Sequence, residues 1–174
     1  MSITVTDAEI KDVLGIRKVF YETWLVTYPN EELGITRDDI EDRYKDAFTK
    51  EKLKKQEDQI KNLPANQKLL VAKDADKVVG VCRIIKHEDK NQLQAIYVLP
   101  QYQGKGIGKM FWNEALRFFD KDKPTFVEVA TYNTKAIEFY KKLGFSDTGK
   151  RIHDENFRMK SGNILPEMEM SLKL

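Results

Sequence analysis

Three glycines at alternate positions constrain this chain more than any other feature of its sequence. They lie in residues 103–108, which read QGKGIG, between a strand-like apolar run at 93–98 and helical spacing from about residue 109 to 119. Glycine has no Cβ, so the backbone of such a loop can approach a ligand closely. A helix that begins after the loop would direct its free N–H groups and positive dipole end toward that ligand. The arrangement favours a phosphate or pyrophosphate group.

Three nucleotide-binding patterns compete for this loop. A Walker loop requires Ser or Thr after Gly-Lys, but Gly108 and Lys109 are followed by Met110, so no hydroxyl is available for magnesium. A dinucleotide-binding fold places its glycine turn after the first strand, whereas these glycines follow three predicted strands and lack Gly-x-Gly-x-x-Gly spacing. The third pattern, Gln/Arg-x-x-Gly-x-Gly/Ala, matches residues 103–108 at every position. A glycine-rich turn that only reverses the chain remains the structural alternative.

A second motif follows about thirty residues later. A strand-like run at 125–130 precedes NTKAIEFYKKLGF at 133–145, with Asn133 at the predicted helix start and Tyr140 four residues before Gly144. Together the two motifs resemble the GNAT superfamily of N-acetyltransferases, whose glycine loop binds the pyrophosphate of coenzyme A. The resemblance covers roughly residues 67–174. In order and general pattern the chain is also similar to bacterial polyamine (spermidine/spermine) N-acetyltransferases of the PaiA type.

Composition limits the broad class of protein. The 174 residues are 41% hydrophobic and 33% charged, which is typical of one globular domain spanning 1–174. The net charge of +2 gives no basic field for nucleic acid, and no apolar run is long enough for a membrane helix. The N-terminus lacks a signal-peptide pattern. The single Cys82 excludes an internal disulfide and is expected to be a small buried hydrophobe. We therefore expect a cytoplasmic monomer or homodimer with no nucleic-acid, membrane or metal partner.

Hydrophobic periodicity predicts an α+β fold with a mixed, mostly antiparallel sheet of six or seven strands and helices on both faces. The expected helices are 7–26 with Asp7 as cap, 37–47, 50–62 with Thr49 as cap, 109–119 and 133–143. The expected strands are 2–6, a hairpin of 68–73 and 77–86, 93–98, 125–130, 145–152 and 165–173. The resemblance adds that strands 93–98 and 125–130 are parallel and splay apart, with pantetheine in the gap.

Acetyl transfer from a thioester to an amine requires a neutral amine, a stabilised oxyanion and a protonated leaving thiolate. The resemblance implies that Tyr140 faces the coenzyme sulfur, and a phenol with a pKa of about 10 can donate a proton there. The alternative is a core aromatic residue. Asn133 could bind the pantetheine arm, cap its helix, or do both. The expected coenzyme-binding residues are Ile96, Tyr97, Val98, Gln103, Gly104, Lys105, Gly106, Ile107, Gly108, Lys109, Asn133 and Tyr140, with the N–H of Val98 polarising the acetyl carbonyl.

The general base departs from the family pattern. Many relatives carry a Glu on the strand before the glycine loop, but here Gln92 and Gln94 occupy that strand and cannot accept a proton. Glu128 is the nearest replacement, and its position between Val127 and Val129 points it away from their side. A chain of water molecules that carries the proton to solvent is the alternative.

The acceptor is predicted from the first part of the chain. Residues 31–42 are rich in acids, which would concentrate a cationic amine, and aromatic residues near the first helix end can contact a cation. The expected substrate-binding residues are Trp24, Tyr28, Glu31 and Glu32. A polyamine such as spermidine is the leading acceptor, whereas an ordinary solvated helix face would explain the acids equally well. The alternatives are a peptide α-amine acetyltransferase, a non-catalytic acyl-CoA-binding module and a nucleotide-binding module.

Overall fold

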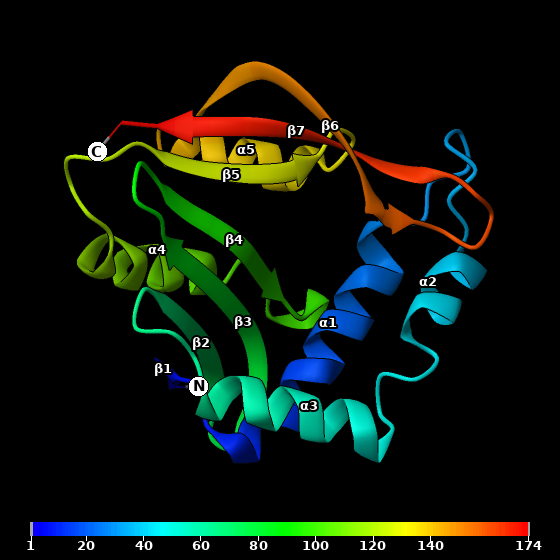
Figure 1. Cartoon of the computed structure of the whole chain (residues 1–174), viewed down its shortest axis with the longest axis horizontal. Helices are drawn as coiled ribbons and strands as arrows, with labels where there is room; N and C mark the ends of the chain where they lie inside the picture. Colours follow the sequence, from blue (N-terminus) through cyan, green and yellow to red (C-terminus); the bar gives the residue numbers. More distant parts are fainter. Residues whose placement is uncertain (1, 174) are drawn as a thin grey trace.

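The computed structural model describes residues 2–173 as a seven-stranded sheet with helices on both faces (Figure 1). The strands lie in the order β1-β2-β3-β4-β5-β7-β6. Their bounds are β1 Ile3–Asp7, β2 Gln67–Asp74, β3 Lys77–Lys86, β4 Asn91–Val98, β5 Thr125–Ala130, β6 Ser146–Arg158 and β7 Ile164–Leu172. The helices are α1 Val13–Thr27, α2 Arg37–Tyr44, α3 Lys50–Lys61, α4 Ile107–Phe118 and α5 Thr134–Lys142. Only the β4–β5 pair is parallel among these strands, so the predicted mixed, mostly antiparallel α+β architecture is confirmed.

The first four strands form an antiparallel half-sheet between two layers of helix. Gly80 of β3 faces α4, because a Cβ there would lie 3.1 Å from the Phe111 ring. Arg83 lies three residues after Gly80 in β3. Because side chains alternate along a strand, Arg83 points to the other face of the sheet, where it lies beside α1 and α3. The main core fills both sides of this half-sheet and includes the fully buried Ile16, Phe111 and Leu93.

The two halves of the sheet join at a short parallel contact. β4 pairs with β5 only at Asn91 with Thr125 and Gln92 with Phe126, so the strands diverge after this point. The buried Asn91 side chain holds the junction, since its Nδ2 donates to the Asp120 carbonyl at 2.8 Å and its Oδ1 accepts from the Asp120 N–H at 3.1 Å. The predicted parallel, splayed strand pair is therefore confirmed.

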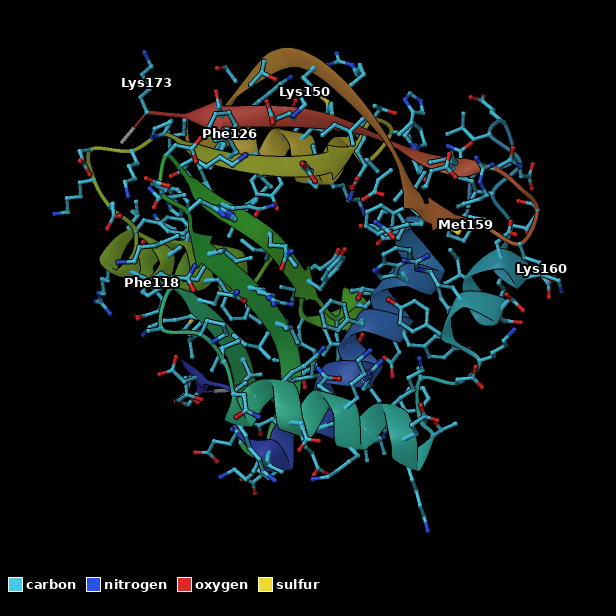
Figure 2. The ribbon with its side chains drawn as sticks, viewed as in Figure 1. Phe118, Phe126, Lys150, Met159, Lys160 and Lys173 are labelled. Atoms are coloured by element: carbon cyan, nitrogen blue, oxygen red, sulfur yellow. The ribbon has the colours of Figure 1, made fainter. Side chains whose placement is uncertain are left out.

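A second, smaller apolar cluster lies where the end of α1 and α2 meet β5 and the β6–β7 hairpin. Its buried members are Trp24, Tyr28, Ile35, Ile40, Ala130, Met159 and Leu165. Met159 and Lys160 lie at the turn of this hairpin, beside α2 (Figure 2). The Asp39 carboxylate of α2 accepts from the Ser161 N–H at 2.7 Å, which fastens the hairpin turn to the helix.

Several predicted boundaries were wrong. Asp7 is not a helix cap but the last residue of β1, paired with Leu70, because pairing with β2 satisfies its backbone. A capping box between Glu9 and Asp12 starts a short 3₁₀ turn before α1 instead. The second helix ends at Tyr44 rather than 47, and β6 continues to Arg158 through two irregularities in its pairing with β7. Thr49 caps α3 as predicted. No helix among residues 2–173 has both the length and the apolar character needed to cross a membrane.

Candidate active site

The glycine loop joins β4 to α4, and two of its glycines are required by the backbone itself. Gly104 and Gly106 have φ angles of +76° and +81°, a region that other residues enter only with strain. A Cβ at either position would meet no atom within 4 Å, so the space above the loop is open. Gly106 is the N-cap of α4, whose first N–H groups have no intrahelical acceptor. The loop can therefore receive an anionic group at both its backbone and its helix end.

The third glycine, Gly108, also has a packing role, and its predicted contact with coenzyme A stays a prediction. A Cβ on Gly108 would lie 3.0 Å from the Phe139 ring, so glycine is needed here for α4 and α5 to pack closely. Gln103 secures the loop to its strand, because its Nε2 donates to the Val98 carbonyl at 3.1 Å. Lys105 lies over the Tyr102 ring with its Nζ 4.8 Å from the centroid. Lys109 is exposed on the first turn of α4, and Ile107 is buried beneath it.

The inner edge of β4 faces the region where β5 has diverged. Ile96, Tyr97 and Val98 are half-buried there. The N–H of Leu99 donates to the Val79 carbonyl of β3 at 2.9 Å. Because N–H directions alternate along a strand, the N–H of Val98 points to the opposite side, away from β3. This orientation is the one expected of a group that would bind an acetyl carbonyl between the strands.

Tyr140 lies on α5, with only 5% of its surface exposed. It packs against Phe145, with 5.7 Å between ring centroids. Burial raises the pKa of Tyr140 well above its ordinary value, and the neighbouring Cys82 and Tyr97 raise it further. The phenol therefore stays protonated and can donate. Cys82 is fully buried and its pKa is raised by burial, in keeping with the expected structural role.

Asn133 begins α5 and has a defined structural role. Its Oδ1 accepts from the Ala136 N–H at 3.2 Å, and its own N–H donates to the Ala130 carbonyl at 2.9 Å. The capping function considered from the sequence is thus confirmed. Contact with a pantetheine arm stays a prediction.

Glu167 on β7 is the functional candidate that the sequence reading missed. It is 8% exposed, and its Oε2 is buried with no hydrogen-bond partner among residues 2–173. Burial, followed by the nearby negative charges of Glu128 and Asp154, raises the pKa of Glu167 to about 7. A carboxyl group with this pKa can accept a proton near neutral pH.

Strand register explains how the two glutamates meet. β5 pairs with β7 so that Ala130 lies opposite Glu167, and Glu128 lies opposite Glu169. All four residues share one sheet face, and Ala130 belongs to the second apolar cluster with Trp24. Glu128 itself is exposed. A signal for Glu167 was present in the sequence, because two glutamates alternate with Met168 and Met170 in a strand whose other face is buried.

Three tyrosines lie close enough to this carboxyl group for its charge to affect their pKa values. The hydroxyls of Tyr28 and Tyr97 lie 3.1 Å apart, and the Tyr132 hydroxyl donates to the Tyr28 carbonyl at 2.7 Å. The Trp24 and Tyr28 rings pack with centroids 4.4 Å apart. Burial raises the pKa of Tyr28, and the negative charge of Glu167 adds to that effect. Trp24 and Tyr28, both predicted to contact the acceptor, therefore belong to the same aromatic neighbourhood as Glu167.

The acidic stretch 31–42 is mostly engaged with the protein itself. Asp39 forms a capping box with Thr36, and its other partner is the β6–β7 turn. Asp38 pairs with Lys160 at 3.1 Å, a lysine that lies beside α2 (Figure 2). Glu41 and Asp42 form local pairs with Arg37 and Lys45. Glu31 and Glu32 are exposed in the turn before α2, so their predicted contact with substrate would be at the rim.

Comparison with known proteins agrees with this geometry. The profile of the Acetyltransferase (GNAT) family matches residues 37–145. Peptidyl-lysine N-acetyltransferase YjaB of Salmonella typhimurium is 33% identical over 94 residues, which are 53% of this chain and 59% of that protein. The chain spans 29%, 59% and 42% of the lengths of three curated relatives that it matches.

Solved structures share the fold over nearly the whole chain. PaiA N-acetyltransferase from Thermoplasma acidophilum, in complex with coenzyme A, has a TM-score of 0.77 and 23% identity, with 100% of both chains covered. A chimera of the spermidine N-acetyltransferase SpeG from Vibrio cholerae and hSSAT has a TM-score of 0.58 and 22% identity, with 99% of this chain and 96% of that chain covered. At these identities the likeness is one of fold. The family match includes both the glycine loop and the helix that carries Tyr140 and spans more than half of the sequence, and the chain therefore belongs to the Acetyltransferase (GNAT) family.

Proposed function

We propose that this protein is an acetyl-CoA-dependent N-acetyltransferase that acts on a primary amine of a small molecule. The observation that carries the proposal is the position of Glu167, a buried carboxyl group with an unpartnered oxygen and a pKa of about 7. It lies in the aromatic neighbourhood of Tyr28 and Tyr97, beside the strand divergence that Tyr140 approaches from α5. Glu167 would thus accept the proton of the attacking amine, and Tyr140 would donate a proton to the leaving thiolate.

The proposed reaction proceeds by direct attack within a ternary complex. The amine enters as an ammonium group and loses one proton to the Glu167 carboxylate, because only a neutral nitrogen has a lone pair for attack. Nitrogen then attacks the thioester carbon, and the Val98 N–H stabilises the oxygen as it becomes negative. As the C–S bond breaks, the Tyr140 hydroxyl donates its proton to the thiolate and regains one from the attacking nitrogen. The products are the N-acetyl amine and the free thiol of coenzyme A, and Glu167 releases its proton to solvent, which restores the carboxylate.

A polyamine such as spermidine is the acceptor that the local charges favour. Glu167, Glu128 and Asp154 place three acidic groups near one another, which suits a ligand with more than one positive charge. The ring faces of Trp24 and Tyr28 belong to the same region and suit a cation. Peptide amines are the second candidate, because YjaB is named a peptidyl-lysine acetyltransferase. We also propose that the reaction takes place in the cytoplasm, in keeping with a single buried cysteine.

The proposed function is tested by following thiol release from acetyl-CoA with four acceptors. These are spermidine, a monoamine of similar length, a peptide with a free α-amine, and an N-terminally blocked peptide with one lysine. We expect kcat/KM to be highest for spermidine. Higher values for either peptide would assign the peptide class instead, and no thiol release with any amine would favour a non-catalytic acyl-CoA-binding module.

If the glycine loop binds acetyl-CoA, alanine substitutions at Gly106 and Gly149 should differ in their effect on acetyl-CoA affinity. Gly106 and Gly149 have similar φ angles of +81° and +85°, and a Cβ at either would meet no atom within 4 Å. Alanine at either site therefore introduces a similar backbone strain of about 1–2 kcal/mol. We expect Gly106→Ala to weaken acetyl-CoA binding by roughly tenfold or more, equivalent to about 1.4 kcal/mol, as measured by calorimetry. Gly149 lies in β6, outside the loop. The Gly149→Ala variant should therefore bind acetyl-CoA as tightly as the unsubstituted protein. Equal affinities in the two variants would remove the loop from the coenzyme site.

A further inference from the structure

A pocket lies on the side of the protein away from the glycine loop, between α1, α3 and the face of β2 and β3 that they cover. It has a volume of about 230 Å³. Its polar lining includes Arg17, Gln56 and Arg83, and its apolar lining includes Phe20, Ile60 and Leu69. None of these residues has a role in the proposed acetyl transfer.

Three buried polar atoms of the residues that line this pocket lack partners. Arg17 Nε, Gln56 Oε1 and Arg83 Nε are all buried without a hydrogen-bond partner in the described part of the chain. Only two other buried side-chain atoms among residues 2–173 share this property. Gln56 is only 8% exposed, so water does not readily satisfy its amide. A buried polar group without a partner costs roughly 1–3 kcal/mol, which makes three such atoms around one pocket unusual for a purely structural feature.

The two guanidinium groups have no carboxylate partner among residues 2–173. Arg17 donates from an Nη to the Lys52 carbonyl at 3.1 Å, and Arg83 donates from an Nη to Gln67 Oε1 at 2.8 Å. Both acceptors are neutral, so neither positive charge is compensated. Burial lowers the pKa of both guanidinium groups from their ordinary value, as expected for charges that are removed from water without an anion.

We propose that this pocket binds a small organic carboxylate that has an apolar body and one hydrogen-bond donor. The carboxylate would accept from the two guanidinium groups, whose planar N–H pairs match its oxygens. The donor group would satisfy Gln56 Oε1, and the apolar body would lie against Phe20, Ile60 and Leu69. The volume is below the roughly 300–1,000 Å³ of pockets for drug-sized ligands, so the ligand is a small one.

A route from solvent reaches the pocket along α3. A larger groove of about 670 Å³ is lined by Arg83, Gln59 and Leu63, which also line the pocket, so the two cavities adjoin. Lys54, Lys55, Glu51 and Asp58 line the groove as well, and Lys54 pairs with Asp58 at 3.0 Å. The entrance therefore carries both signs of charge, and the uncompensated positive charges lie further in, at Arg17 and Arg83.

The pocket is separated from the proposed active site by an aromatic wall. Phe20 lines the pocket and packs against Tyr97 with ring centroids 5.1 Å apart. Tyr97 in turn lies on the inner edge of β4, where its hydroxyl is 3.1 Å from that of Tyr28. Binding in the pocket therefore does not require acetyl-CoA or an amine, and it can be measured on the protein alone.

The test uses 4-hydroxybenzoate, with 4-hydroxybenzamide as a neutral control of the same shape and inorganic phosphate as a control anion. Calorimetry should give saturable binding of 4-hydroxybenzoate to the unsubstituted protein and none of the benzamide. Arg83→Gln and Arg17→Gln should each weaken binding by roughly tenfold or more. Arg117→Gln, an exposed arginine on α4 that pairs with Glu114, should leave binding unchanged.

A second measurement needs no variant. In a protein labelled with ¹⁵N at arginine, the Nε–Hε signals of Arg17 and Arg83 should move on titration with 4-hydroxybenzoate, while that of Arg117 should stay in place. Three results would overturn the proposal. These are no saturable binding of 4-hydroxybenzoate, equal binding of the benzamide, and tighter binding of inorganic phosphate than of the carboxylate. The last of these would assign a plain anion site.

Discussion

Replacing Glu167 by glutamine should lower the rate of acetyl transfer by roughly 10²–10⁴-fold, the usual scale for one general acid–base group. Glutamine keeps the shape and the polarity of the side chain but cannot accept a proton. The amine would then have to lose its proton to water before attack, which is unfavourable near neutral pH because primary amines have pKa values of about 10. Steady-state thiol release with saturating acetyl-CoA measures the loss.

The pH profile identifies the group that titrates. Since burial and neighbouring acids raise the pKa of Glu167 to about 7, kcat/KM should rise with pH through about 7 as the carboxyl group becomes deprotonated. Glu167→Gln should remove this rising limb and leave only the ionisation of the amine at higher pH. A limb near pH 7 that persists in Glu167→Gln would show that another group takes the proton.

Two further glutamates serve as controls. Glu169 lies two residues along the same strand and is equally buried at 8%, but its carboxylate pairs with Lys150 at 3.1 Å and with Thr148. Glu169→Gln should therefore retain activity and the pH limb. Glu128→Gln tests the base proposed from the sequence. If Glu128→Gln loses the limb and Glu167→Gln retains it, the roles of the two residues are reversed.

Glu167→Gln should also make the folded protein more stable in alkaline solution. The folded-state pKa of Glu167, about 7, is higher than the unfolded value of about 4.3, so folding favours the protonated form. Stability therefore falls as pH rises from about 4.3 to 7, and the full penalty is present above pH 7. Glu167→Gln should raise the free energy of unfolding by up to about 3 kcal/mol at pH 8 and change it little at pH 4. Activity lost together with stability gained would separate chemistry from folding.

Replacing Tyr140 by phenylalanine should lower kcat by roughly 10- to 1,000-fold, at or below the usual scale for a proton donor. Phenylalanine preserves the ring packing against Phe145 but removes the hydroxyl, so the departing thiolate would have to take its proton from water. Because burial and the neighbouring Cys82 and Tyr97 hold the pKa of Tyr140 well above its ordinary value, the phenol is the donating form at all working pH values.

Binding and packing controls accompany this variant. Acetyl-CoA affinity by calorimetry should change little in Tyr140→Phe, because the hydroxyl is proposed to act on the leaving group. Tyr21→Phe, at a ring that packs against Tyr44 and Phe48, should keep full kcat. A Tyr140→Phe protein with full kcat would reduce Tyr140 to a packing residue, the alternative that its place beside Phe139 and Phe145 also allows.

The sequence by itself determined the features that depend on neighbouring residues. The glycines at 104 and 106 allow the left-handed backbone that the loop adopts, and the helical pattern that follows them predicts a helix end at the loop. Asn133 and Thr49 cap their helices through bonds to residues three positions away. Periodicity also predicted the β2–β3 hairpin and the α5 motif. Both depend on hydrogen bonds and side-chain alternation between residues that are close in the sequence.

The tertiary structure alone decided where distant residues meet. Asp38 and Asp39 gain partners in Lys160 and Ser161, which reach α2 only through the β6–β7 hairpin. Glu167 became a candidate base because β7 inserts between β5 and β6 in one register, which buries its carboxyl group and brings it close to Glu128. A shift of one residue would turn Glu167 to the other face of the sheet. The chemistry of this site therefore follows from strand pairing. The raised pKa of Glu167 could not be predicted from the sequence, because it depends on burial by residues that are distant along the chain.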